Sequence, residues 1–322
     1  MKSTHAIREA TTPMNPFASS TAAWVRTAVL ALLVALPPLA RAAEQRTFAT
    51  PEAAVQALID ALKANDEQAL IAIFGDQHKD LIGSGDAAAD AVKRAEAAAL
   101  LERFRTLDDP APDRRVLLMG EWAWPLPIPI VRQGNVWRFA TEQGAEEVIN
   151  RRIGGNERNA ISTLHAYVDA QREYASRDRN GDGVFEYARR LDSTPGKFDG
   201  LYWPADASKG EEQSPLGPLI AESSAYMAGR KPGDPYRGYR FRILTGQGKN
   251  AAGGAYSYII NGRMLAGFGM VAYPSAYAKS GVMTFIVNQN GKVFEKDLGP
   301  DTEAIAAKMT TFDPGPGWKA TP

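Results

Sequence analysis

The chain has no cysteine and only three histidines among its 322 residues. The absence of cysteine excludes disulfides, thiolate nucleophiles and zinc sites that use sulfur ligands. The sequence also contains no G-x-S-x-G elbow of a serine hydrolase and no G-K-[ST] ending of a phosphate-binding loop. The chain therefore lacks the sequence signals of these enzyme classes.

Neither charge is in surplus, because 37 lysines and arginines balance 37 acidic residues. The expected loss of a basic N-terminal leader leaves the remaining protein slightly acidic. Such a surface has no general attraction for nucleic acid or anionic lipid. We predict that nucleic acid is not a partner.

The apolar run from Thr27 to Leu36 is well short of the roughly 20 residues needed to cross a bilayer. Basic residues precede the run, and Ala40-Arg41-Ala42 follows it with small residues at the two positions that a signal peptidase reads. We expect residues 1–42 to be a signal peptide that is cut after Ala42. The processed protein is then expected in the periplasm or outside a Gram-negative bacterium, without a membrane span.

Oxygen-bearing side chains alternate in the segment D-R-N-G-D-G, residues 178–183. This is the opening of a calcium-binding loop, in which positions one, three and five supply side-chain oxygens and a glycine forms the bend. Position seven supplies a carbonyl and position nine a water-mediated contact. The spacing predicts a calcium site formed by Asp178, Asn180, Asp182, Val184 and Glu186.

Position twelve of the loop is Arg189, where calcium loops have a bidentate glutamate. Three interpretations stay open. The loop binds calcium weakly, or a carboxylate such as Asp192 or Glu173 completes the site, or the loop is a metal-free turn.

The first third of the chain predicts helices followed by strands. Thr50-Pro51-Glu52 is typical of a helix start, and the alanine-rich residues 87–103 predict a further helix. A hairpin is expected from Ile128 to Ala140, turned at Gly134-Asn135. This order resembles the cystatin-like or NTF2-like α+β folds, so we assign residues 43–145 to such a unit. Three tryptophans would line its cone or fill its core: Trp122, Trp124 and Trp137.

The pattern changes near Glu146. A helix is predicted from about Asn156 to Arg177, followed by antiparallel strands with turns at Asn261-Gly262 and Asn290-Gly291. A long helix before an antiparallel sheet resembles a pilin-like domain. We therefore expect an α+β protein with a pilin-like unit at residues 146–312 and a flexible tail at 313–322.

Several long strings resemble an uncharacterised family of exported bacterial proteins, domain of unknown function 2950 (DUF2950). They are Tyr167 to Asp178, Ser193 to Pro204, Pro215 to Leu219 and Glu295 to Thr302. The resemblance implies export and common ancestry, and it brings no established activity.

One of these strings contains a candidate recognition patch of Lys197, Asp199, Tyr202 and Trp203. The alternative is that its aromatic rings anchor the loop in the core. We predict a non-catalytic binding or assembly protein of the cell envelope, with an envelope protein or polymer as partner and a weak structural calcium site. The alternative is an acid/base hydrolase or isomerase that acts on an envelope carbohydrate or small molecule through carboxylates such as Asp199 and Glu186.

Overall fold

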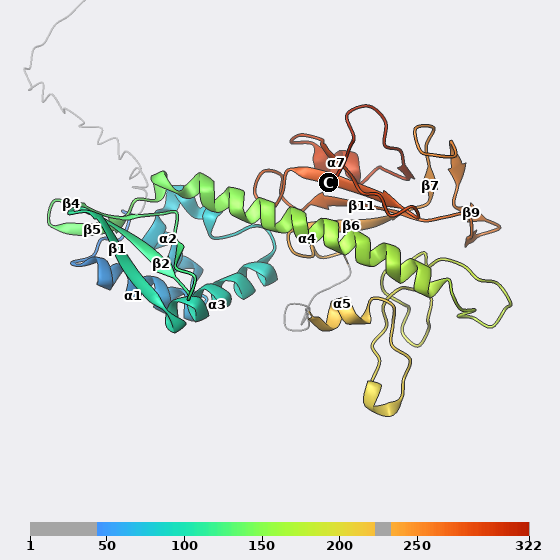
Figure 1. Ribbon diagram of the computed structural model, residues 1–322, viewed down its shortest axis with the longest axis horizontal. Coiled ribbons are helices and arrows are strands. Elements are labelled where there is room, and N and C mark those ends of the chain that lie inside the picture. Colours follow the sequence, from blue (N-terminus) through green and yellow to red (C-terminus); the bar gives the residue numbers. More distant parts are fainter. Residues whose placement is uncertain (1–43, 223–232, 322) are drawn as a thin grey trace, which may run out of the picture. The chain divides into compact units, whose positions relative to one another are not determined.

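The computed structural model describes residues 44–222 and 233–321 (Figure 1). The predicted signal peptide, residues 1–42, lies outside the described residues. Within the described ranges, no helix is both long and apolar enough to cross a membrane. Helices and mainly antiparallel sheets make up this part of the chain, which confirms the α+β class.

Three helices open the described chain, each started by a side-chain cap. The Thr50 hydroxyl accepts the Ala53 N–H at the start of α1, as predicted, while Asp66 and Asp86 cap α2 and α3 in the same way. A short 3₁₀ helix, η1, follows α2. The elements are α1 (Pro51–Lys63), α2 (Glu67–Phe74), η1 (Asp76–Leu81) and α3 (Ala87–Arg103).

An antiparallel sheet follows in the order β1-β2-β4-β5, with β3 paired to β2. The β4–β5 hairpin turns at Gly134-Asn135, as predicted, with Gln133 opposite Val136. The apolar faces of α1, α2 and the sheet enclose a first core that includes Leu58, Ile73 and Phe139. The strands are β1 (Arg105–Ala111), β2 (Arg114–Met119), β3 (Trp124–Pro125), β4 (Ile130–Gln133) and β5 (Val136–Phe139).

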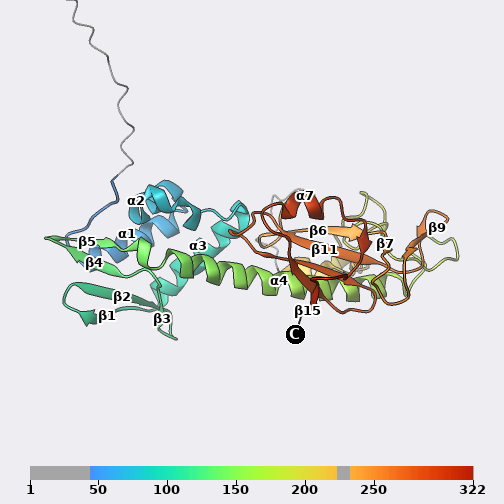
Figure 2. The same ribbon diagram turned by 90° about the horizontal axis from the view of Figure 1, so that it is seen from above.

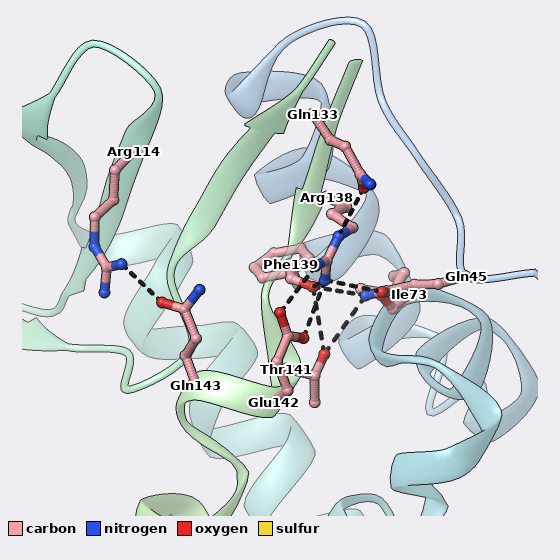
Figure 3. A network of polar contacts seen from close by, with 9 residues as sticks. All are labelled: Gln45, Ile73, Arg114, Gln133, Arg138, Phe139, Thr141, Glu142 and Gln143. Carbon is pink, nitrogen blue, oxygen red and sulfur yellow. Dashed lines mark hydrogen bonds and ion pairs between the residues drawn. The ribbon is translucent and has the colours of Figure 1, made fainter.

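A polar network joins the beginning of the described chain to this sheet (Figure 3). The Gln45 amide donates to the carbonyls of Ile73 and Phe139, at 2.8 and 2.7 Å. Arg138 donates to both carboxylate oxygens of Glu142, which lowers the pKa of Glu142. The network connects α2 to β5 and to the 3₁₀ turn η2 (Thr141–Gln143).

The helix predicted from about Asn156 begins eleven residues earlier, as α4 (Ala145–Tyr174), with thirty residues. Gly154 and Gly155 oppose a continuous helix, because each lowers helix stability by about 1 kcal/mol relative to alanine. Packing outweighs them, because Val148 packs against the first core and Leu164 is buried in a second one.

The second sheet has the order β15-β13-β12-β11-β6, with every pair antiparallel. Alternate residues of β11 enter two different cores: Met270 faces the core that α4 covers, and Val271 faces the core that includes Ala306 of α7. Helices α4 and α7 thus cover opposite faces of this sheet (Figure 2). The elements are β6 (Tyr239–Leu244), β11 (Gly269–Pro274), β12 (Met283–Asn288), β13 (Phe294–Asp297), α7 (Thr302–Ala306) and β15 (Lys319–Ala320).

Smaller elements complete the described second half. A hairpin turned at Asn261-Gly262, as predicted, joins β9 to β10. The strands β14, β7 and β8 form a three-stranded sheet, and a 3₁₀ turn and a short helix are also present. The bounds of all these elements are β7 (Gly246–Gln247), β8 (Tyr256–Ser257), β9 (Ile259–Ile260), β10 (Arg263–Met264), β14 (Thr311–Phe312), η3 (Ala207–Lys209) and α5 (Gly217–Glu222).

The expectation of a flexible tail at residues 313–322 is wrong for its described part. Glu295 of β13 pairs with Lys319 of β15, and the Thr321 N–H donates to the Val293 carbonyl at 3.0 Å. Trp318 packs against the core beneath α7. The glycines and prolines of this segment suggested a tail, whereas backbone pairing and a partly buried indole hold it on the sheet.

Replacing Gly155 by alanine should stabilise the protein by roughly 0.5–1 kcal/mol, because alanine loses less backbone freedom in a helix interior. A Cβ at Gly155 would meet no heavy atom within 4 Å. Urea unfolding followed by circular dichroism measures the change. Gly144→Ala is the control: its Cβ would lie 2.3 Å from the Pro127 carbonyl oxygen, so this variant should lose stability. A less stable Gly155→Ala protein would argue against an uninterrupted α4.

Candidate functional site

The predicted calcium loop folds around the carboxylate of Asp178. One carboxylate oxygen accepts the Gly181 N–H at 2.8 Å, and the other accepts the Gly183 N–H at 2.7 Å. Gly181 and Gly183 have φ of 73° and 83°, the left-handed region that glycine adopts without strain. The Asp182 carboxylate accepts the Val184 N–H at 3.0 Å. The backbone thus bends as the sequence spacing requires.

A cation from another part of the chain faces this loop. Arg263 of β10 forms an ion pair with Asp182 at 2.6 Å. The hydrogen bond to Asp182 raises the pKa of Arg263, and the charges of Glu186 and Asp178 raise it further. The pKa of Asp182 is lowered by the Arg263 hydrogen bond, and that of Asp178 by the Gly183 N–H. Three carboxylates therefore act on one positive charge.

The other loop positions are also placed. The Asn180 amide donates to the Glu186 carboxylate at 3.4 Å, so positions three and nine lie close together. Arg189, at position twelve, donates to the Gly262 carbonyl at 2.6 Å. Among the described residues, no group of three or more histidine, cysteine or acidic side chains is arranged as a metal site.

The end of the loop is fixed to α4 by a buried amide. The Gln171 side chain donates to the Ala188 carbonyl and accepts the Ala188 N–H, both at 2.8 Å. Its amide nitrogen also reaches the Tyr167 hydroxyl, at 3.1 Å. Gln171 is fully buried, so both ends of its amide group are satisfied within the core.

The candidate patch at residues 197–203 is divided between surface and core. Trp203 is only 5% exposed and donates its indole N–H to the Glu212 carbonyl at 2.9 Å. Tyr202 is half-buried and Lys197 is exposed. Burial alone would raise the pKa of Asp199, but hydrogen bonds from Thr194 bring it below its usual value. Trp203 therefore anchors the loop, in agreement with the alternative interpretation.

Two of the three tryptophans expected in the core or cone of the first unit lie on the surface. Trp122 is 86% exposed and Trp124 60%, whereas Trp137 is buried. They flank Ala123, whose φ of 50° is unusual for a residue with a side chain. A tight turn between β2 and β3 therefore directs both indoles outward, and the sequence G-E-W-A-W between strands was the signal for it.

Further exposed apolar side chains lie near Gly120, where this turn begins. Gly120 donates its N–H to the Phe104 carbonyl at 2.9 Å, and a Cβ at Gly120 would lie 3.1 Å from the Leu100 side chain. Leu100 and Phe104 are themselves exposed. We call Leu100, Phe104, Trp122 and Trp124 the tryptophan patch. Large apolar side chains that are exposed near one another are typical of interaction sites.

A comparison with protein families gives a match to the model described as "Protein of unknown function (DUF2950)", over residues 45–321. The chain belongs to the DUF2950 family. No curated protein and no solved structure gives a match. The family includes the loop and the tryptophan patch within its matched range but assigns no activity to either.

The exposed indoles should dominate collisional quenching of tryptophan fluorescence. Replacing Trp122 and Trp124 together by phenylalanine should lower the acrylamide quenching constant and shift the remaining emission to shorter wavelength, since buried indoles stay. Trp203→Phe is the control and should leave the quenchable fraction almost unchanged. Strong quenching that survives the double substitution would contradict the exposed position of this turn.

Proposed function

We propose that this chain is an exported, non-catalytic binding protein of the cell envelope that recognises its partner through the tryptophan patch. The observation that carries the proposal is the exposure of Trp122 and Trp124 on one turn. Burying one such ring against a partner contributes about 3 kcal/mol through the apolar area removed from water. Tryptophan is also enriched among the residues that dominate binding energy.

The turn that carries the two indoles is ordered before any partner binds. Met119 pairs with Trp124 and Leu118 with Pro125, and the Ala123 N–H donates to the Gly120 carbonyl at 2.9 Å. A surface that is already ordered loses less conformational entropy when it docks. This favours recognition of a partner by a preformed patch.

In the acid/base alternative, a carboxyl group that serves as general acid would have a pKa raised toward neutrality. In the described part of the chain, each carboxyl group with a resolved shift has a lowered pKa, including Asp199 and Asp178. Such groups are ionised and suit binding and hydrogen bonding.

We also propose the finer fold assignment, a cystatin-like or NTF2-like unit followed by a pilin-like unit. It is supported by the order of elements: helices α1 to α3 precede the first antiparallel sheet, and α4 precedes the second. The two sheets share no strand.

Partner capture should depend on the two indoles. We expect Trp122→Ala/Trp124→Ala to weaken retention of the partner from periplasmic extract at least roughly 30-fold, equivalent to about 2 kcal/mol. The matched control is Ile260→Ala/Ile305→Ala, because both isoleucines are exposed elsewhere. Protease treatment of the captured material separates a protein partner from a polymer. Equal capture by the two double variants would refute the role of the tryptophan patch in partner binding.

We further propose that the Asp178 loop is a weak structural calcium site. Asp182 pairs with Arg263, the charges of Asp178 and Glu186 also act on this guanidinium group, and carboxylates are the ligands that calcium prefers. Asn180 and the Val184 carbonyl would complete the ligand set. Arg263 would compete with the metal for Asp182, so a dissociation constant of roughly 10⁻³ M is expected, as in extracellular modules.

At about ten times this constant, calcium should stabilise the protein by roughly 1.4 kcal/mol and raise the melting midpoint by about 3 °C relative to chelator. Asp182→Ala should abolish the shift, while Arg263→Gln should enlarge it because the competing cation is removed. Asp206→Ala, an acid in another polar turn, is the control. If calcium leaves the midpoints of both the wild type and Arg263→Gln unchanged, the loop is a metal-free turn.

A further inference from the structure

A cavity of about 470 Å³ lies where α3, α4 and the end of η1 meet. Its volume falls within the range of small-molecule sites. Its apolar walls come from several elements of the first core, including Leu70, Phe74, Ile82 and Val148. None of these residues belongs to the tryptophan patch or to the calcium loop.

The charged lining of the cavity is mainly basic, with five lysines and arginines against two acids. The pair Lys93–Glu96 is exposed, which leaves it little influence on the interior. Arg94 is more important: its side chain is only 11% exposed, and its closest approach to a carboxylate is 3.9 Å, to Glu67. Beside this long ion pair, it donates hydrogen bonds to the Asn65 side chain and the Ile82 carbonyl.

Arg152 of α4 brings a second positive charge to the same cavity. Its guanidinium donates to the carbonyls of Asp80 and Leu81 at the end of η1. In the described part of the chain it has no carboxylate at ion-pair distance. Of the five donors of a guanidinium group, these two bonds leave the others available.

The acids nearest to Arg152 are engaged elsewhere. Asp80 forms an ion pair with Lys279 at 2.8 Å, and Asp90 accepts the Ser84 N–H at 2.8 Å. Burial lowers the pKa of Arg152; the charge of Asp90 opposes this effect, and that of Arg94 adds to it. Two like charges beside an apolar cavity are stabilised when an anion lies between them.

We propose that this cavity binds a single-chain amphipathic carboxylate, with its head group held by Arg94 and Arg152 and its apolar chain against Leu70, Phe74 and Val148. Guanidinium groups suit this head group because their planar donors match the two oxygens of a carboxylate. The apolar walls remove the chain from water. This site is independent of partner binding at the tryptophan patch.

Isothermal titration calorimetry with three small probes separates the two parts of the proposal. Decanoate, below its micelle concentration, should bind at least tenfold more tightly than decanol, which lacks the charge, and than acetate, which lacks the chain. Equal binding of decanoate and decanol would remove the role of the arginines. Equal binding of decanoate and acetate would remove the role of the apolar walls, and no binding of decanoate would overturn the proposal entirely.

Two pairs of variants locate the site. Ala97 lines the cavity and Ala95 is exposed on the same helix, so Ala97→Phe should weaken decanoate binding at least tenfold and Ala95→Phe should not. Arg94→Gln should have a similar effect, with the exposed Arg103→Gln as its control. Circular dichroism confirms that each variant is folded. If Arg94→Gln fails to fold, Ala97→Phe and Ala95→Phe still test the location of the site. Unchanged decanoate binding by Ala97→Phe would show that decanoate binds outside this cavity.

Discussion

The packing of one helix against two hydrophobic cores determines much of the described structure. The first turns of α4 contribute Val148 and Ile149 to the core beneath the first sheet, and its later turns contribute Leu164 and Val168 to the core beneath the second. Each sheet needs a helix to cover its apolar face. Helices α1 and α2 cover the first sheet, and α4 covers the second while its first turns pack against the first core. The arginines near the start of α4 and the loop after its end are therefore positioned by one continuous element.

That element also relates the candidate sites to one another. Arg152 extends from α4 toward the end of η1, and Gln171, five turns later, holds the end of the Asp178 loop. The tryptophan patch is positioned differently, by pairing between the β2–β3 turn and the end of α3. The proposed partner site therefore lies on the β2–β3 turn and the end of α3, whereas α4 lines the cavity of the proposed carboxylate site.

Local signals in the sequence predicted the parts of the fold that depend on neighbouring residues. Thr50 and Pro51 start a helix wherever an apolar face follows, and Gly134-Asn135 turns a hairpin without help from the rest of the chain. The extent of α4 could not be predicted in this way, since Gly154 and Gly155 oppose a helix and only contacts distant in sequence outweigh them. The strand at Lys319 likewise depends on its partner, Glu295.

The same distinction applies to the sites. The bend of the Asp178 loop follows from its own glycines and was predicted, but Arg263, 81 residues further along the chain than Asp182, could be found only in the structure. Trp203 and Trp122 are the same residue type in aromatic-rich strings, yet one is buried and the other exposed. Composition does not distinguish them. Trp203 packs into the core, whereas the turn at Ala123 leaves Trp122 on the surface.

The hydrogen bonds of Gln171 restrict which side chains can occupy its position. Its amide group offers Ala188 one donor and one acceptor, as a residue of a neighbouring strand would. A glutamate of the same length would present acceptors alone when ionised, leaving the Ala188 carbonyl without a donor and a charge inside the core. An asparagine would be shorter by one methylene group. Glutamine at this position thus makes the two backbone hydrogen bonds that a neighbouring strand would make, and it joins the end of the Asp178 loop to α4.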